Sequence, residues 1–298
     1  MSFKTRLFKD KWGKRWMYFL VVFSISITML IGLGLYLKSI PLLSITSSYE
    51  LLSSAEWMPG KGKFGLLAFI TGTLWVTFTA MIIAIPPCIL TAIYLTEYAS
   101  ARVTSAVRPV IDVLAGIPSV IFGVWGILLI VPFISDFVAP LFGIHSSGYT
   151  VFAGGIVLAV SIFPVIIQLL IELFKTVPLE LREASLSLGA TKWQTIKWVM
   201  LRKAGPGVVS AFVIGFSRAF GETMSVILVT GNVIKVPKGL FDPAYPLPSL
   251  IANNYGEVLS IPMYDSLLMF VALTLFVIVL VFNIISRYIL LKVEQSSI

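Results

Sequence analysis

The stretch SLLMFVALTLFVIVLVFNIISRYIL, residues 266–290, decides the fold of this chain. It is apolar throughout apart from a few polar side chains and a single charge, Arg287. An apolar segment of about 20 residues is long enough to cross the hydrocarbon core of a bilayer as a helix. Five further apolar runs of similar character occupy 17–38, 66–95, 110–139, 150–174 and 207–231. The sequence therefore predicts an all-α membrane protein with six transmembrane helices.

The composition of the chain excludes a soluble globular enzyme. Of its 298 residues, 58% are hydrophobic and only 12% are charged, whereas a soluble domain carries about 25% charged residues. The net charge of +8 could indicate nucleic-acid binding, but the Lys and Arg residues gather at the ends of the apolar runs. That placement is typical of charges that orient helices in a membrane.

The distribution of Lys and Arg between the connecting segments predicts the orientation of the chain, because cytoplasmic loops carry the excess. The N-terminal tail, the second connection, the fourth connection and the C-terminal end carry six, two, six and two, which makes sixteen. The opposite side carries five. We expect a multi-pass protein of the cell (inner) membrane with both termini in the cytoplasm.

Prolines and glycines interrupt several of the apolar runs. Pro86–Pro87 lies in the second run, Gly116–Pro118 in the third, and Gly154–Gly155 and Pro164 in the fourth. Proline is tolerated in a membrane helix because neighbouring helices can satisfy the freed backbone groups. We expect kinked helices that are buried in a bundle.

The cytoplasmic segment 175–206 has the pattern of a helix, a bend and a second helix. Glu180 and Glu183 lie where the dipole of the first helix favours anions. Gly189 is placed to end that helix in the left-handed conformation, and Thr191 can cap the next one. From the pattern alone, this segment either lies on the membrane surface or projects as a docking element for a soluble partner.

The same segment resembles the EAA motif of ABC importer permeases. The resemblance lies in Glu183–Ser185, in Gly189 after three further residues and in Val199–Leu201 after nine more. The family pattern closes with Leu-Pro, whereas Arg202 follows Leu201 here. In that family this loop is the coupling helix, which fits into a cleft of the ATP-binding subunit. The resemblance implies that this contact is made by Glu183, Ala184, Ser185 and Gly189.

The sequence contains no ATP-binding motif of its own. No Gly-x-x-x-x-Gly-Lys-Ser/Thr phosphate loop occurs, because Gly60–Lys63 lacks the hydroxyl residue that should follow. The single His145 and the single Cys88 exclude a metal cluster. We therefore expect a transporter subunit rather than an enzyme, with no cofactor or metal in this chain, and a partner subunit that binds ATP and Mg.

Two opposite charges, Arg218 and Glu222, lie four residues apart inside the fifth apolar run. Each charge at the centre of a membrane helix costs about 2.5–3.5 kcal/mol on insertion scales, so helix stability gives no reason for either. The pair can meet on one helical face and neutralise itself, or it can line an aqueous pathway in which the guanidinium meets an anion. Ser225 falls on the same face and Thr223 is adjacent, which makes these four residues the candidate substrate pathway.

Further motifs resemble the phosphate importer permeases, over about residues 50–290. They are Glu56–Pro59, Phe64–Gly65, Gly72–Leu74, Tyr94–Ala99, Gly116–Val120, Arg218–Met224, Gly231–Asn232 and Pro248–Asn253. The external Glu-Trp-x-Pro and the form Gly-Glu-Thr-Met-Ser-Val are more similar to the PstC permease than to its sister PstA. The resemblance implies the type I ABC importer permease fold, with a five-helix core, a peripheral N-terminal helix and a cytoplasmic coupling helix.

This fold implies a division of the chain into segments. A basic cytoplasmic tail, 1–16, precedes the peripheral transmembrane helix, 17–38, and an external loop, 39–65. The permease core covers 66–290 and includes the coupling loop, 175–206, and an external loop, 232–265. A cytoplasmic tail, 291–298, follows.

The resemblance also implies an assembly. The family works as two different permeases, two copies of an ATP-binding subunit and an external phosphate-binding protein. The expected partners are therefore a PstA-type permease, two PstB-type ATP-binding subunits, a PstS-type binding protein and the lipid bilayer, without nucleic acid. The expected function is ATP-driven import of inorganic phosphate by alternating access.

Three other functions fit parts of the pattern. An ABC permease for another oxyanion or for an amino acid would have a similar coupling loop, and only Arg218 favours an anion. An ion-coupled secondary carrier could use Glu222 as its proton site, although such carriers often contain internal repeats and none is recognisable here. A membrane scaffold or sensor would not need a charge pair in a pathway.

Overall fold

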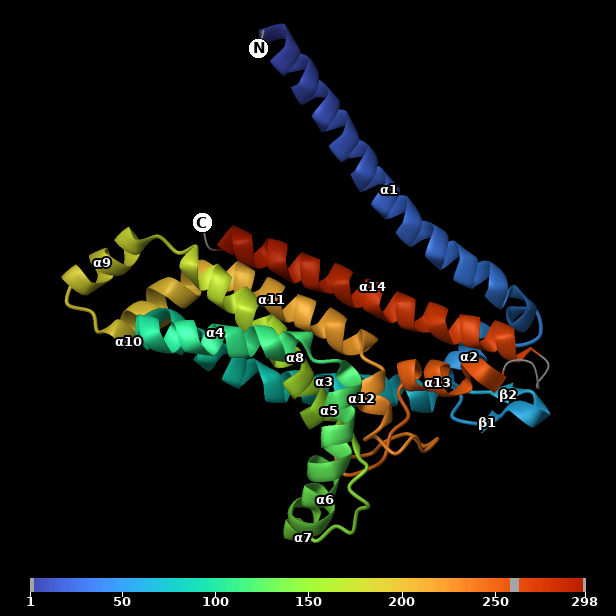
Figure 1. Ribbon diagram of the computed structural model, residues 1–298. Coiled ribbons are helices and arrows are strands. Elements are labelled where there is room, and N and C mark those ends of the chain that lie inside the picture. The colour runs from blue at the N-terminus through green and yellow to red at the C-terminus, as the bar shows by residue number, and fades with distance from the viewer. Residues whose placement is uncertain (1–2, 258–262, 297–298) are drawn as a thin grey trace.

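The computed structural model of the chain describes residues 3–257 and 263–296. Residues 1–2, 258–262 and 297–298, which belong to the predicted tails and to the predicted external loop 232–265, lie outside this description. Within the described part, six helical segments are long and apolar enough to cross a membrane, and most of them lie side by side in a bundle (Figure 1). The six transmembrane helices predicted from the sequence are confirmed.

The elements follow one another with short connections. The long helices are α1 (Phe3–Leu43), α3 (Leu67–Ile93), α8 (Val151–Lys175), α11 (Leu201–Gly221) and α14 (Tyr264–Ser296). The shorter helices are α2 (Ser48–Ser53), α4 (Ala101–Gly116), α5 (Ser119–Trp125), α6 (Val131–Phe133), α7 (Ala139–Leu141), α9 (Leu179–Ser187), α10 (Lys192–Gln194), α12 (Met224–Ile227) and α13 (Leu247–Asn254). Strands β1 (Trp57–Met58) and β2 (Lys63–Phe64) pair antiparallel. Turns of π-helix at Tyr94–Tyr98, Gly126–Ile130, Ile134–Val138 and Thr195–Met200 extend or join the helices.

Helices α3 and α8 form the centre of the bundle. About half of the most apolar part of each helix is buried, 50% in α3 and 56% in α8. Gly155 of α8 lets the two backbones approach closely, because a Cβ at this position would lie 2.5 Å from Cγ2 of Thr79. Fully buried apolar side chains fill the space around this contact, among them Met81, Leu158, Ile162 and Ile166.

The second and fourth spans continue through their prolines, whereas the third run breaks at its proline. Pro86–Pro87 lies inside α3 and Pro164 inside α8, as expected for helices buried in a bundle. The prediction of one kinked helix through Gly116–Pro118 is wrong, because α4 ends at Gly116 and α5 begins after Pro118. Ile117 has the extended angles φ −67° and ψ 128°, and a following proline favours that conformation.

The fifth span lies earlier in the chain than the apolar run predicts. It covers Lys192–Gly221 rather than 207–231. The second helix of the segment 175–206 does not stop before the membrane span but continues through the π-helical turn Thr195–Met200 into α11, which contains Pro206. The helix then ends at Gly221, and glycine is one of the least favourable residues in a helix.

Helix α1 is peripheral, as the importer fold implies. None of its most apolar part is buried within the described chain, and it diverges from the bundle along its length (Figure 1). Its second half approaches α14 closely, since a Cβ at Gly32 would lie 3.1 Å from the ring of Phe276. The third span, α5 to α7, also leaves the bundle and extends from it as an arm (Figure 1).

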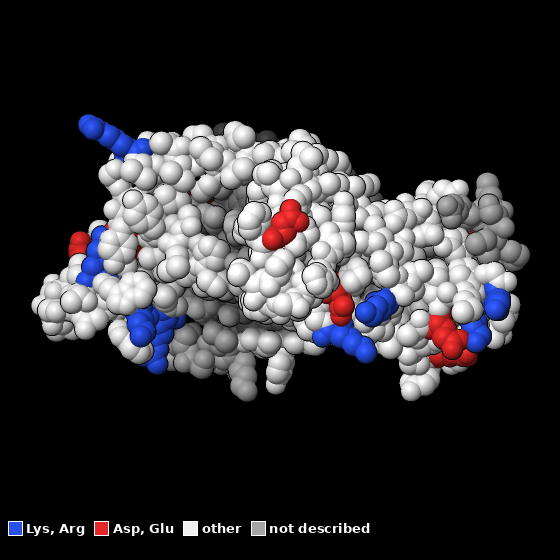
Figure 2. Space-filling model, turned by 90° about the horizontal axis from the view of Figure 1, so that it is seen from below, with Lys and Arg blue, Asp and Glu red and all other residues white. Residues whose placement is uncertain are grey.

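The two ends of the bundle differ in structure. At one end the β1–β2 hairpin packs with α2, α13 and the beginnings of α3 and α14, and we call it the hairpin end (Figure 1). At the other end α9 and α10 project, and we call it the α9 end (Figure 1). Figure 2 shows mostly basic side chains near one end, mixed charges toward the other, and between them a surface that is largely white and carries one acidic group near its centre. A surface with few charges suits a protein that spans a bilayer, because a charged side chain in the hydrocarbon core is costly.

Candidate functional site

The bend after α9 forms as its sequence predicts. Gly189 has φ +83°, the left-handed conformation that glycine adopts without steric cost. Thr191 caps the next helix, because its hydroxyl accepts the N–H of Gln194 while the Gln194 side chain accepts the N–H of Thr191 at 2.8 Å. Both predictions for this segment are confirmed.

Helix α9 presents most of its surface to its surroundings. None of its residues is buried, and three apolar side chains on or just after it stand far out, with exposed fractions of 62% for Leu179, 47% for Leu186 and 89% for Leu188. The predicted contact residues Glu183, Ala184 and Gly189 are also exposed. Exposed apolar groups that gather on one projecting element are typical of a surface that another protein covers.

The inner side of α9 meets the bundle through polar contacts. Ser185 and Thr195 share a hydrogen bond of 2.9 Å between their hydroxyls. Arg182 forms an ion pair with Glu97, with 2.7 Å between Nη1 and Oε1, and its Nη2 donates to the carbonyl of Phe174 at 2.7 Å. Ser185 therefore contacts this chain as well as lying in the predicted docking motif. Sequence reasoning missed the Arg182–Glu97 pair.

The predicted charge pair is not joined in the structure. Helix α11 ends at Gly221, and Glu222 has the extended angles φ −74° and ψ 124°. Arg218 and Glu222 therefore do not lie one turn apart on a helix, and no ion pair joins them among the described residues. The interpretation of a pair that neutralises itself on one helical face is wrong, because the helix ends at Gly221 and Glu222 lies in the extended chain that follows.

The break in the fifth span borders a hollow of about 500 Å³. Glu222 and Thr223 lie on one side of it, and α13 forms another wall. The lining residues are Ser119, Gly221, Glu222, Thr223, Met224, Pro248, Ile251, Ala252 and Leu275. The structure thus brings together Glu222 and Thr223 but neither of the other two predicted pathway residues. Arg218 is exposed one turn earlier on α11, and Ser225 is fully buried.

Polar contacts fix the wall that α13 contributes to this hollow. The hydroxyl of Tyr245 accepts from the side-chain amides of Asn253 and Asn254, at 3.0 and 3.1 Å. The backbone N–H of Leu247, at the start of α13, donates to the hydroxyl of Thr73 in α3 at 2.8 Å. Because buried backbone donors are costly to leave unpaired, α3 determines where α13 begins.

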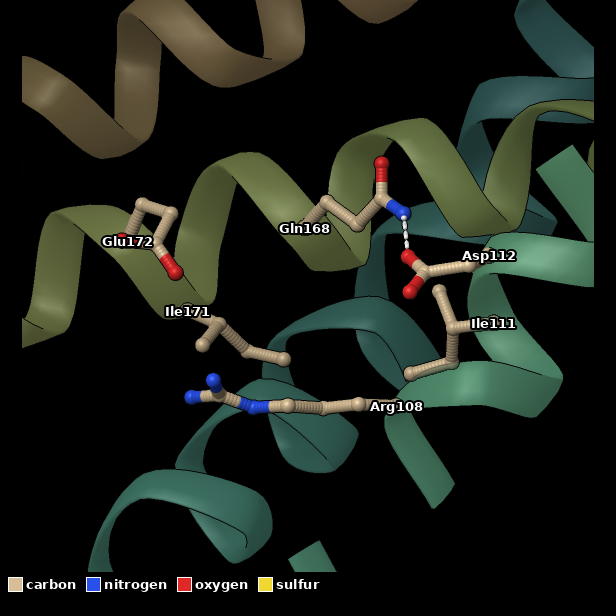
Figure 3. A pocket seen from close by; sticks show the side chains of 6 residues that line it. All are labelled: Arg108, Ile111, Asp112, Gln168, Ile171 and Glu172. Carbon is tan, nitrogen blue, oxygen red and sulfur yellow. Dashed lines mark hydrogen bonds between the residues drawn. The ribbon is translucent and has the colours of Figure 1, made fainter. Parts of the chain in front are cut away.

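A second hollow, of about 310 Å³, lies between α4 and α8 toward the α9 end. Figure 3 shows Arg108 and Asp112 on one wall and Gln168 and Glu172 on the other. The Gln168 amide donates to Asp112 at 2.7 Å, and Lys175 pairs with Glu172 at 2.5 Å. Both signs of charge border this hollow, so its lining gives no preference for an anion. In the described part of the chain, no cluster of three or more His, Cys, Asp or Glu side chains could hold a metal ion.

Comparisons with known proteins assign this architecture to a family. The family model of the binding-protein-dependent transport system inner membrane component matches residues 88–295. The phosphate transport system permease protein PstC of Xylella fastidiosa strain Temecula1 is 34% identical over 258 residues, which cover 82% of this chain and 79% of that protein. The protein of the same name from Pasteurella multocida strain Pm70 is 35% identical over 266 residues, which cover 85% and 82%.

A solved structure shows the same fold. The bacterial alginate ABC transporter, crystallised with an alginate pentasaccharide-bound periplasmic protein, contains a chain that superposes with a TM-score of 0.61. The match covers 95% of this chain and 96% of that one at 16% sequence identity. At this identity the similarity concerns the fold alone, which is that of type I ABC importer permeases.

Proposed function

We propose that this chain, which belongs to the family of binding-protein-dependent transport system inner membrane components and is an ABC importer permease of the PstC type, imports inorganic phosphate. Energy would come from ATP hydrolysed by a partner subunit, because this chain is a permease. The single observation that carries the proposal is the similarity to PstC proteins over more than four fifths of the chain.

We place the α9 end in the cytoplasm, together with both termini. The basic residues described at this end outnumber those of the hairpin end, and cytoplasmic segments of membrane proteins carry the excess of Lys and Arg. The hairpin end then faces outward. Its exposed surface would receive a phosphate-binding protein, and α9 would meet a nucleotide-binding subunit.

The docking role of α9 rests on its exposure. A helix that buries none of its own residues gains little from the bundle, so its conformation is best explained by a second protein that covers its leucines. Glu183, Ala184 and Gly189 lie on the exposed side and would contact the groove of the ATP-binding subunit, in the helix-in-groove mode of recognition. Ser185 orients α9 through Thr195.

The pathway would run past the break in the fifth span. Arg218 is exposed and carries no ion pair in the described chain, so its guanidinium is available to a phosphate, whose oxygens accept paired, charge-assisted hydrogen bonds. Glu222 and Thr223 border the hollow beyond it. A carboxylate repels an anion, so Glu222 would limit how long phosphate stays near Arg218. Ser225 is buried behind this surface and would support it.

Alternating access follows if ATP binding favours one of two conformers of the permease pair. A ligand shifts an equilibrium only by its differential affinity for the two states. In this scheme ATP, bound by the partner, stabilises the outward-open conformer, and hydrolysis restores the inward-open one. The transporter would consist of this chain, a second permease and two ATP-binding subunits, and it would work with one external binding protein.

Uptake of labelled phosphate into vesicles that contain the complete complex tests the proposal. We expect uptake to require both ATP inside and the phosphate-loaded binding protein outside, and to survive collapse of the proton gradient when ATP is maintained. Uptake that follows the proton gradient and ignores ATP would contradict the importer and favour a secondary carrier.

The variant Arg218→Gln tests the pathway in the same assay. We expect it to assemble normally and to lose most phosphate uptake, because removing one donor to a charged group costs about 2–4 kcal/mol, or roughly 30- to 1,000-fold. Arg102→Gln, an exposed arginine outside the hollow, is the matched control. Full uptake by Arg218→Gln would remove this arginine from the pathway.

A further inference from the structure

The ion pair between Arg182 and Glu97 ties α9 to a span that is distant in the sequence. The two side chains are 18% and 10% exposed, so water screens their attraction less than it would at the surface. Arg182 also donates to the carbonyl of Phe174, the penultimate residue of α8. One guanidinium therefore holds the ends of two central helices, α3 with its π-helical extension and α8.

A second cation, Lys192, contacts the same π-helical extension of α3. Lys192, the first residue of α10, donates to the backbone carbonyl of Glu97. Its Nζ also lies 4.7 Å from the centre of the Tyr98 ring, within the range of a cation–π contact. Residues on both sides of the Gly189 bend thus hold the π-helical turn Tyr94–Tyr98, and such turns are frequent at functional sites.

Helix α3 connects the segment held by Arg182 and Lys192 to the other end of the bundle. Together with its π-helical turn it forms one helical segment from Leu67 to Tyr98. Near its other end, Thr73 accepts the N–H of Leu247 at 2.8 Å. Leu247 begins α13, whose Pro248 and Ala252 line the hollow beside Glu222. Specific bonds therefore connect α9 at one end to the wall of the hollow at the other.

We propose that the Arg182–Glu97 pair is the positioning contact through which movement of α9 passes into α3 and from there to α13 and the hollow. The hydrogen bond of Ser185 to Thr195 leads only into the helix that follows α9 in the chain, whereas the ion pair reaches the second span directly. This inference rests on the proposed function, because it names the contact that couples the ATP-binding partner to the pathway.

A static role for the pair makes a different prediction. A pair that only holds α9 in place would lower the stability of the complex equally in every nucleotide state. A transmitting contact changes how the hollow responds to nucleotide. The decisive readout is therefore the nucleotide dependence of accessibility at the hollow, rather than stability or assembly.

The variant Ala252→Cys, at an exposed position in the wall of the hollow, reports this accessibility. The parent protein for this experiment carries Ala252→Cys together with Cys88→Ser, which removes the buried native cysteine. The complete complex is reconstituted in liposomes, and a charged thiol reagent is added outside, with or without ATP and vanadate inside. We expect nucleotide trapping to change the labelling rate of the parent by about fivefold or more, the range of typical coupling between two sites.

We expect Arg182→Met and Glu97→Gln to assemble with the ATP-binding subunit but to label at the same rate in both nucleotide states. Arg182→Lys keeps the charge but only part of the hydrogen-bonding geometry, so it should retain part of the response. Arg102→Met removes an exposed arginine at the same end, and it should respond like the parent.

A full response in both Arg182→Met and Glu97→Gln would overturn the proposal, and so would a parent that does not respond to nucleotide. If Arg182→Met does not assemble, Glu97→Gln decides, because it leaves the guanidinium in place. Failure of both to assemble would assign the pair a static role and refute transmission. The reporter needs no phosphate, so a parent that responds to nucleotide but imports no phosphate would contradict only the proposed substrate.

Discussion

At the hairpin end the ring of Trp57 packs 4.8 Å from that of Phe69 and 6.5 Å from that of Tyr264, whereas at the α9 end α9 meets the bundle through Arg182 and Ser185. Apolar burial is non-directional and grows with the area removed from water. Polar contacts are few and directional, and each contributes little net stability. The chain therefore fixes one end by its own packing and leaves the other available to a partner.

Phe69→Ala should have the largest effect on stability, because it removes a buried ring from the packed hairpin end. Phe69 is fully buried, and truncation of a buried Phe to Ala costs about 3–5 kcal/mol. We expect a strongly lowered melting temperature of the solubilised complex, while the phosphate imported per ATP by the folded fraction stays unchanged. Phe78→Ala, on the same helix with the side chain 44% exposed, should lose less stability. Equal melting temperatures of the two variants would show that apolar burial does not fix the hairpin end.

Gly189→Ala should have an intermediate effect, and it acts on the other end. No heavy atom lies within 4 Å of a Cβ at this position, so the cost comes from the left-handed backbone alone, about 1–2 kcal/mol. We expect the bundle to melt almost normally while binding of the ATP-binding subunit and uptake both weaken. Gly205→Ala, a helical position that is also open, is the control. Normal binding by Gly189→Ala would show that the bend does not set the docking geometry.

Asp242→Asn should have the smallest effect, and it tests a loop near the hairpin end. The backbone N–H of Lys238 and the charge of Lys235 lower the pKa of Asp242 despite its partial burial. A lowered pKa in the folded protein stabilises the fold at neutral pH, and this contribution is lost as the pH falls through the folded pKa.

Melting temperatures measured between neutral pH and about pH 3, across the ordinary Asp pKa, check this sign. The parent should lose slightly more stability on acidification than Asp242→Asn does. Lys238→Ala keeps the backbone donor and should follow the parent. A parent and an Asn variant with identical pH profiles would show that the carboxylate contributes nothing to this loop.

Local properties of the sequence predict much of the fold. Apolar length predicts the six spans, and a glycine followed by Thr191 predicts the bend and the capped helix after α9. These features depend on a few neighbouring residues, so no knowledge of the packing is needed.

The breaks within spans could not be predicted in the same way. Pro164 leaves its helix continuous, whereas Pro118 separates two helices, and the difference depends on what surrounds each backbone. The end of α11 at Gly221 has a similar origin. A glycine there weakens the helix, but only the packing of α12 and α13 around the break directs Glu222 into the hollow.

The candidate sites also differ in whether neighbouring residues or distant segments form them. Glu183 and Gly189 belong to one short motif and are found together, whereas the hollow beside Glu222 joins Ser119 and Pro248 from distant segments. The Arg182–Glu97 pair is also non-local. A charged residue at the end of an apolar run signals an interface position, but no spacing rule connects Glu97 with an arginine on another connection.

The tandem Pro86–Pro87 gives α3 a further property. Neither proline has an N–H, so the carbonyls of Ile82 and Ile83 lose their usual helical donors. A helix without two successive hydrogen bonds bends more easily at that point than elsewhere. A pull applied at Glu97 would therefore reach the half of α3 that carries Thr73 through a preferred bending point, so the angle at Pro86–Pro87 sets the direction in which that half moves.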